Sequence, residues 1–315
     1  MPALTIAVPT YHRPDDLREL LPLLATQARE LESAPGSDYT VEILVVDNDP
    51  HGSGRDAAQE IGGVRTVVEP QPGIASVRNR ALDEAEGSRL LAFIDDDERP
   101  RDGWLAHLVR TWEKTGAAVV SGRVVVAFGR PLDPWLDAGG FFARRSLPTG
   151  TAIDIASTNT LLLDLDQVRA SGVRFALDLG LSGGEDTLFS RQLHHAGYRM
   201  VWCDESAIVD AIPAHRQTRG WVLRRAFSHG NSTAVVQVRL AQGGAARTVA
   251  RARALAGGLG RILGGIARVC LGLLTGSLRH QARGSRAAYR GLGMLWGALG
   301  GVYQEYARPV TTASP

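Results

Sequence analysis

The sequence predicts an α/β fold, in which a mostly parallel sheet with flanking helices is followed by C-terminal amphipathic helices. Short apolar runs alternate with helical segments, the runs lying at residues 4–8, 41–46, 65–68 and 90–94. Such runs are apolar on both faces, which is typical of strands that are buried in a parallel sheet. A basic segment with helical periodicity then ends the chain. These two patterns together predict the fold class.

The composition bounds the class of protein. The chain has 315 residues, of which 44% are hydrophobic and 22% charged, so it can bury a full core. Its two cysteines, Cys203 and Cys270, lie far apart without CxxC or metal-finger spacing, so neither a disulfide framework nor a zinc site is indicated, and a reducing, cytosolic setting fits best. The first residues show no basic region followed by an apolar run, so we expect no signal peptide.

The remaining elements are predicted in chain order. Helices are expected near residues 15–29, 55–61, 74–86, 102–115, 166–171, 183–196 and 218–229. Further strands are expected within residues 117–128, 153–163 and 198–203. The segment 129–150 is rich in Gly, Pro and aromatic residues, so we interpret it as an acceptor-side loop, with a packed excursion as the alternative.

Three consecutive acids follow the apolar run at 90–94. Asp95, Asp96 and Asp97 therefore stand where a central strand ends. Ligands of open α/β sheets bind outside the carboxyl ends of the strands. Adjacent carboxylates repel one another unless a cation compensates them, and their hard oxygens suit Mg²⁺ or Mn²⁺. The alternative is an acidic turn in which Asp97 caps the next helix.

Several motifs in this order resemble glycosyltransferase family 2. They are the early VPTYHRP, a second strand that ends in Asp47, the acidic triplet and a later Gly-Glu-Asp at residues 184–186. The resemblance covers roughly residues 4–230 and depends on the order and spacing of the motifs, because a lone DxD is uninformative. It implies the GT-A fold and a metal-dependent, inverting sugar transferase of the single-addition type.

The resemblance also implies a nucleotide site. By it, Pro9, Thr10, Tyr11 and Arg13 line the pocket of the base, and Asp47 accepts hydrogen bonds from the base or ribose. The alternative for Asp47 is a cap for the following helix.

The same resemblance implies a metal site beside the nucleotide. Arg78 and Asn79 match the Arg-Asn pair of the family. Asp95 and Asp97 match the outer acids of the metal-binding motif, and Asp96 is expected near the ribose. A Mg²⁺ or Mn²⁺ ion there acts as a Lewis acid on the diphosphate.

The acceptor side is implied by later residues. Glu185 and Asp186 match a Glu-Asp pair in which the aspartate takes the proton from the acceptor hydroxyl; an acidic helix cap is the alternative. His215 matches a histidine that completes the metal shell in some relatives, and a surface histidine is the alternative. Arg219 and Arg225 are expected on the diphosphate. The motif around Arg219 departs by one residue from that of processive members, which favours single addition.

The C-terminal tail is strongly basic. From residue 239 onward it has eleven arginines and Glu305 as its sole acid, a formal charge of +10. Arg279, Arg283, Arg286 and Arg290 are spaced to share one side of a helix. No run reaches the ~20 uninterrupted apolar residues that span a bilayer. We therefore expect the tail to lie on an anionic membrane surface, or alternatively to pack on the catalytic domain or a partner subunit.

These interpretations combine into one hypothesis. Residues 1–235 form a GT-A catalytic domain and residues 236–315 the basic tail. The enzyme moves a sugar from a nucleotide sugar, with UDP favoured, to a lipid-linked saccharide or other glycan precursor at the inner face of the plasma membrane; no nucleic-acid partner is expected. The rivals are a nucleotidyltransferase, whose Gly-rich loop is absent, and a non-catalytic sugar-nucleotide-binding protein, against which the intact acids count. A dehydrogenase is excluded because GxGxxG is missing.

Overall fold

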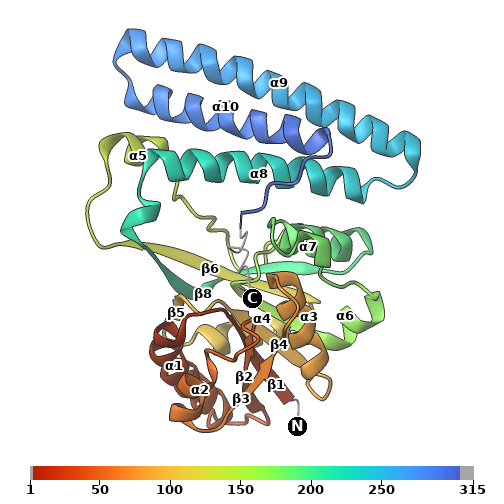
Figure 1. The fold of residues 1–315 in the computed structure, drawn as a ribbon. Helices are drawn as coiled ribbons and strands as arrows, with labels where there is room; N and C mark the ends of the chain where they lie inside the picture. Colours follow the sequence, from red (N-terminus) through yellow and green to blue (C-terminus); the bar gives the residue numbers. More distant parts are fainter. Residues whose placement is uncertain (1–2, 306–315) are drawn as a thin grey trace, which may run out of the picture. The chain divides into compact units, whose positions relative to one another are not determined.

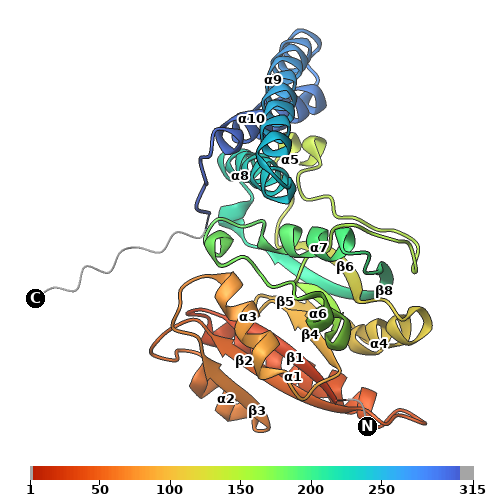
Figure 2. The same ribbon diagram turned by 90° about the vertical axis from the view of Figure 1, so that its right-hand side faces the viewer.

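Two compact units make up the chain. The computed structural model describes residues 3–305 (Figures 1 and 2). The first unit, which we call the sheet unit, comprises Met1–Gly129, Phe142–Leu177 and Glu185–Ile212. The second, the helical unit, comprises Arg130–Phe141, Asp178–Gly184 and Pro213–Pro315.

The sheet unit contains one eight-stranded sheet with the order β3-β2-β1-β4-β7-β6-β8-β5. Its strands are β1 (Ala3–Thr10), β2 (Thr40–Asp47), β3 (Val64–Val68), β4 (Leu90–Ile94), β5 (Glu98–Pro100), β6 (Val119–Phe128), β7 (Thr160–Asp164) and β8 (Met200–Ile212). The first four strands pair in parallel. β7 runs antiparallel to both β4 and β6, after which β8 pairs in parallel with β6 and β5 closes the edge antiparallel to β8.

Helices cover both faces of this sheet. They are α1 (Pro14–Glu32), α2 (Arg55–Ile61), α3 (Ile74–Glu84), α4 (Trp104–Thr115), α6 (Leu165–Ser171) and α7 (Glu185–His195). Leu90 and Ile94 of β4 belong to the apolar core that includes α1 and α4. Leu91 and Phe93 belong to the opposite core, which includes α3 and α7. Side chains alternate across a strand, so a strand buried on both sides is apolar throughout.

Two sequence predictions about this region are wrong. A strand was expected over residues 153–163, but it begins only at Thr160, because the preceding residues leave the sheet and the Asn159 amide bonds to Glu98. The expected loop 129–150 contains α5 (Pro134–Gly139), a short helix of the helical unit. Asp133 caps it by accepting hydrogen bonds from the amides of Trp135 and Leu136.

The helical unit is built from α5 and three longer helices. These are α8 (Arg219–Leu240), α9 (Gly244–Thr275) and α10 (Leu278–Ala298). Glycines let the backbones of α9 and α10 touch: a Cβ built on Gly291 would lie 2.5 Å from the carbonyl oxygen of Gly258. On another side of α10, a Cβ on Gly293 would lie 1.9 Å from the carbonyl oxygen of Phe227 in α8. The predicted domain boundary at 235/236 falls inside α8 and stays a prediction.

The outer face of α9 is apolar and exposed. Its exposed side chains include Leu259, Leu263, Ile266, Leu273 and Leu274. An 18-residue window of α9 has a mean hydropathy of 1.4 and is only 17% buried, so by length and composition α9 could cross a membrane. The sequence prediction concerned an uninterrupted apolar run, and Arg261 and Arg268 do interrupt α9. Its length and average composition nevertheless suit a membrane span.

Candidate active site

The carboxyl ends of the parallel strands bring the predicted donor-side residues to one edge of the sheet. Thr10 ends β1 and pairs in register with Asp47, which ends β2. Asp95 directly follows β4, the other neighbour of β1. The sheet therefore places the early loop and the acidic triplet side by side, as ligand sites of open α/β sheets require.

Arg13 binds the acidic triplet. Its Nη1 lies 2.7 Å from Asp96 Oδ1 and 2.9 Å from Asp97 Oδ2. Thr10 donates a hydrogen bond of 2.8 Å to the other oxygen of Asp96. Burial raises the pKa of Asp96 to about 7, although Arg13 and Thr10 favour its charged form. Thr10 and Arg13 were predicted to line the base pocket, and in this structure both hold Asp96.

A second guanidinium lies at the other end of the triplet. Arg78 on α3 is buried, with Nη2 3.8 Å from Asp95 Oδ1. Its Nη1 forms an ion pair with Glu185 Oε1, and its Cζ lies 5.8 Å from the centroid of the Phe175 ring. Burial raises the pKa of Asp95 to about 6; Arg78 opposes this shift, and the charge on Asp97 adds to it. The protein itself thus supplies cations at both ends of the triplet.

Glu185 and Asp186 form the first turn of α7. Oδ1 of Asp186 accepts hydrogen bonds from the amide of Thr187 at 2.6 Å and from its hydroxyl at 3.2 Å. Oε2 of Glu185 is buried and has no hydrogen-bond partner among the described residues. Burial raises the pKa of Glu185 to about 7 against the influence of Arg78. One oxygen of Asp186 therefore bonds to the next residue within the first turn of α7, whereas these hydrogen bonds do not use Oδ2.

The side chains of Asp47 and Asn79 bond to loop backbone, and the sequence did not decide between such a role and contact with a nucleotide. The two carboxylate oxygens of Asp47 accept hydrogen bonds from the amides of Asp49 at 2.9 Å and Gly54 at 2.7 Å, which fixes the loop before α2. The side chain of Asn79 bonds to both the carbonyl and the amide of Phe175, at 2.9 and 3.0 Å. Both residues shape the loops around the site, and their contacts with a nucleotide stay predictions.

The loop after β1 is conformationally special. Pro9 lies within β1, and Tyr11 follows it with 36% of its side chain exposed. His12 has a φ of +54° and is the one described non-glycine residue whose φ is positive. Such a conformation is costly for a residue with a Cβ and is retained where neighbouring contacts enforce it. Here Asp49 lies 3.4 Å from the His12 ring and Arg13 is fixed by the triplet.

Glu98 is a site residue that sequence reasoning missed. Its Oε1 accepts a hydrogen bond of 2.6 Å from Asn159, while Oε2 is buried without a hydrogen-bond partner among the described residues. Burial raises its pKa well above the usual value, and the charges of Asp95 and Asp97 add to the shift. The signal was present, because Glu98 is the fourth acid of the run, but the sequence patterns predicted neither a role for it nor the short strand β5 that it begins.

The remaining predicted residues belong to the helical unit. His215 is exposed in the turn Ala214–Arg216. Arg219 lies 3.1 Å from Asp133, and its Cζ is 5.1 Å from the centroid of a Trp135 ring. Arg225 forms an ion pair with Glu305. Their predicted roles toward a metal and a diphosphate stay predictions.

The carboxylates of Asp95 and Asp97 suit a hard divalent cation that binds together with a substrate phosphate. Among residues 3–305, no three His, Cys, Asp or Glu side chains form a group that could hold a metal. Asp95 and Asp97 nevertheless each expose 35% of their side chains, on either side of the buried Asp96. Mg²⁺ is commonly held by one or two carboxylates together with substrate phosphates and water. These two residues fit that mode and no closed protein cage.

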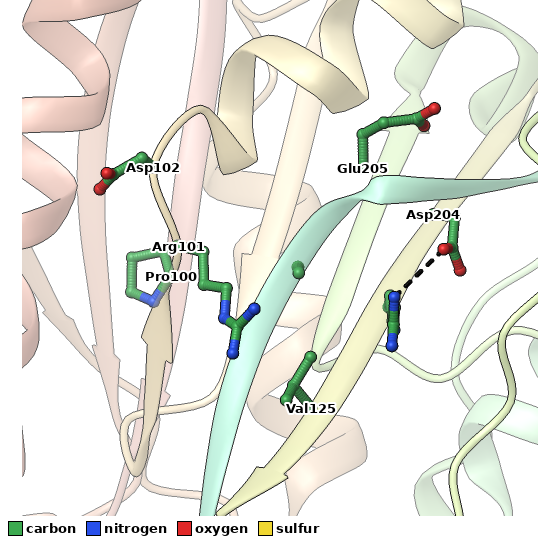
Figure 3. A pocket seen from close by; sticks show the side chains of 8 residues that line it. Pro100, Arg101, Asp102, Val125, Asp204 and Glu205 are labelled. Atoms are coloured by element: carbon green, nitrogen blue, oxygen red, sulfur yellow. Dashed lines mark hydrogen bonds and ion pairs between the residues drawn. The ribbon is translucent and has the colours of Figure 1, made fainter.

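A separate hollow lies elsewhere on the sheet unit (Figure 3). Its lining residues come from β5 and the turn after it, from β6 and from β8: Pro100, Arg101, Asp102, Arg123, Val125, Asp204, Glu205 and Ala207. Arg123 and Asp204 form an ion pair of 3.2 Å on one side of it. None of the predicted site residues lines this hollow.

Comparison with known proteins identifies the family. Residues 5–165 match the family model described as Glycosyl transferase family 2. The chain belongs to this family. The Succinoglycan biosynthesis protein ExoM of Rhizobium meliloti (strain 1021) is 32% identical over 232 residues, which cover 72% of either chain. The prediction that the protein is a glycosyltransferase is confirmed.

Solved structures confirm the fold of this glycosyltransferase. The mannosyltransferase PcManGT from Pyrobaculum calidifontis, in complex with GDP-Man and Mn²⁺, aligns with a TM-score of 0.58 at 17% identity, over 94% of this chain and 87% of its own. S. aureus TarS 1-349 in complex with UDP-GlcNAc aligns with a TM-score of 0.50 at 14% identity, over 92% of either chain. At these identities the likeness shows the GT-A fold, as predicted.

Proposed function

We propose that this enzyme transfers one sugar from a nucleotide sugar to a glycan precursor, with inversion and with the help of Mg²⁺ or Mn²⁺. The observation that carries the proposal is the position of Arg78, whose guanidinium lies 3.8 Å from Asp95 and forms an ion pair with Glu185. This contact supports a cation site at the acidic triplet with a base on α7 nearby.

Support for the substrates comes from relatives. ExoM is named for succinoglycan biosynthesis, which favours a polysaccharide precursor, and a lipid-linked one is our choice. Structural neighbours bind GDP-Man or UDP-GlcNAc, which favours a nucleotide sugar as the donor. We retain a UDP-sugar as the preferred donor.

Asp186 is proposed as the base. Its Oδ2 takes the proton of the acceptor hydroxyl as that oxygen bonds to the anomeric carbon, the bond from this carbon to the phosphate oxygen breaks, and the nucleoside diphosphate leaves. Attack from the side opposite the leaving group inverts the configuration. Glu185, paired with Arg78, holds the start of α7 in place.

Asp95 and Asp97 are proposed to hold the cation. When bound, a divalent ion supplies positive charge to the departing diphosphate. Arg13 and Thr10 fix Asp96 between the two ligands. The loop of Pro9 and Tyr11, together with Asp47 and Asn79, is proposed to form the nucleotide pocket.

Three residues of the helical unit keep the roles that the resemblance to the family implies. Arg219 and Arg225 are proposed to contact the diphosphate, and His215 to complete the metal shell. Arg219 and Arg225 each have a carboxylate partner in the described structure, so binding the diphosphate requires an exchange of partners.

The test combines donor binding with turnover. Purified enzyme is offered UDP-, GDP- and dTDP-sugars with Mn²⁺ or EDTA, and hydrolysis and binding are measured. Asp97→Ala should lose metal-dependent donor binding, whereas Asp186→Asn should keep binding and lose roughly 10²- to 10⁴-fold in turnover. Asp56→Asn, an exposed acid of α2, is the matched control. An Asp186→Asn enzyme that keeps most of its turnover removes the base, and failure to bind any sugar nucleotide removes the proposal.

We further propose that the enzyme sits at the inner face of the plasma membrane through α9. Leu263 and Leu274 expose 60% and 86% of their side chains on its apolar face. Burying such side chains at an interface, with basic residues nearby, favours binding to anionic lipid. The free thiol of Cys270, also exposed on α9, can carry a polarity-sensitive fluorophore.

Vesicle binding tests this location. Anionic vesicles should shift the emission of the Cys270 label to shorter wavelength and pellet the protein. Leu263→Glu with Leu274→Glu should abolish both effects, while Leu23→Glu, at a leucine of α1 that is 40% exposed, should not. Unchanged pelleting of the double variant would disprove the proposed contact.

A further inference from the structure

Four arginines of the helical unit lie near one another and have no acidic partner among residues 3–305. We call Arg261 of α9 and Arg283, Arg286 and Arg290 of α10 the arginine cluster. Residues 283, 286 and 290 are spaced to share one side of α10. Arg261 reaches the same helix, because a Cβ built on Gly291 would lie 3.1 Å from the Arg261 Cβ.

The side chains of Arg283 and Arg286 converge beside α5. Nη1 of Arg286 lies 3.4 Å from the carbonyl oxygen of Gly140, and its Cζ is 5.7 Å from the centroid of the Phe141 ring. Nη2 of Arg283 lies 3.9 Å from the position of a Cβ built on Gly140. Two guanidiniums therefore approach one backbone turn, and neither finds a carboxylate there among the described residues.

The charge of the helical unit is unbalanced. Its described residues include fifteen arginines but only four carboxylates: Asp133, Asp137, Asp178 and Glu305. Three of these acids are already paired, with Arg219, Arg239 and Arg225. Within residues 3–305, the cluster bonds only to backbone carbonyls, such as that of Gly257, which lies 3.1 Å from Arg261 Nη1.

The cluster is also partly buried. Arg283, Arg286 and Arg290 are half-buried, and Nε of Arg290 is buried with no hydrogen-bond partner among the described residues. Burial lowers the pKa of Arg286 and Arg290, and neighbouring guanidiniums of the cluster lower it further. A buried cation without a counter-ion is unfavourable. An anion that entered the cluster would remove this penalty.

We propose that the arginine cluster binds the phosphate or diphosphate group of a phosphorylated lipid. The planar fork of a guanidinium matches phosphate oxygens in pairs. A lipid is indicated because α9, which supplies Arg261, also carries exposed Leu259 and Leu263 within two residues of it. The group belongs either to a membrane phospholipid or to the lipid-linked acceptor, and only the second source rests on the proposed function.

Binding of a soluble lipid diphosphate tests the cluster. Full-length protein is titrated calorimetrically with geranyl diphosphate in EDTA, so that no metal-dependent donor binding contributes. The double variant R286Q/R290Q should raise the Kd roughly tenfold or more, since each Arg-phosphate contact is charge-assisted. R251Q/R253Q is the matched control, because it removes the same charge from exposed positions of α9 and should change the Kd less than about twofold.

Thermal unfolding separates binding from folding. Without ligand, R286Q/R290Q should unfold at the same or a higher temperature than the parent, because it loses repulsion and no ion pair. R286K/R290K keeps the charge but not the fork and should bind with intermediate affinity. If parent and R286Q/R290Q bound geranyl diphosphate and anionic vesicles equally well, or if the control lost as much binding as R286Q/R290Q, the proposal would be overturned.

Two vesicle preparations distinguish a membrane phospholipid from the lipid-linked acceptor as the source of the phosphate group. Vesicles of phosphatidylcholine with or without phosphatidylglycerol are compared with geranyl diphosphate. If R286Q/R290Q weakens binding to the vesicles alone, the cluster binds a phospholipid headgroup. If it weakens binding to geranyl diphosphate, the cluster binds the lipid-linked acceptor. If neither probe binds through the cluster while the parent enzyme still hydrolyses its donor, this inference fails and the proposed function stands.

Discussion

Replacing Arg78 by methionine isolates the buried ion pair that links α3 to α7. Arg78 and Glu185 each expose 5% of their surface, and Oε2 of Glu185 has no hydrogen-bond partner in the described part of the chain. Arg78→Met would leave the Glu185 carboxylate buried without its cation. Removal of one partner of a buried pair costs about 3–5 kcal/mol.

The size of this loss depends on pH. The folded-state pKa of Glu185 is already raised to about 7, above its usual value. Loss of Arg78 raises it further, by an amount worth about 1.4 kcal/mol for each unit. The native state then holds a proton that the unfolded chain has released, so stability falls as pH rises from the unfolded to the folded pKa. The variant therefore differs from the parent only above the parent's pKa of about 7, so we expect a small deficit at pH 5 and a deficit that grows above pH 7 by about 1.4 kcal/mol for each pH unit.

Urea unfolding of four proteins measures the effect. They are the parent, Arg78→Met, Glu185→Leu and the double variant, each followed by circular dichroism at pH 5 and pH 8. Replacing both partners by apolar side chains is close to neutral, so the coupling energy should be about 1–2 kcal/mol at pH 8, about one unit above the parent's pKa of Glu185. Two results would refute the reasoning. One is a loss of unfolding free energy in Arg78→Met that does not change with pH, and the other is a double variant whose loss equals the sum of the losses in the two single variants.

Further predictions follow from glycine packing and from the thiols. Gly291→Ala would push a Cβ to 2.5 Å from the Gly258 carbonyl oxygen and should cost about 1–3 kcal/mol in urea unfolding. Gly260→Ala, on the same helix pair with nothing within 4 Å of the new Cβ, should instead stabilise by about 0.5–1 kcal/mol; equal effects would disprove the contact. With a thiol reagent, exposed Cys270 should react at once, while Cys203, whose pKa burial raises, should react only on unfolding. Two fast thiols in the native protein would contradict this burial.

Local patterns of the sequence identified the sheet correctly. The run at residues 90–94 was expected as a buried strand, and β4 has those bounds. Its five residues are all buried because they alternate between two apolar cores, and apolarity on both faces is visible without a structure. The same pattern failed at residues 153–159, where apolar side chains pack on the core but the backbone does not join the sheet until Thr160.

The sequence by itself determined the family, the alternation of strands and helices as far as β4, and the position of three acids at the end of β4, because each depends on neighbouring residues. Only the tertiary structure decided which charges meet. Arg78 pairs with Glu185, 107 positions away, and Arg13 with Asp96, 83 positions away. It likewise decided that Asp47 fixes a loop and that Arg290 lacks a partner among the described residues. Such contacts arise from packing between distant elements, which local periodicity does not encode.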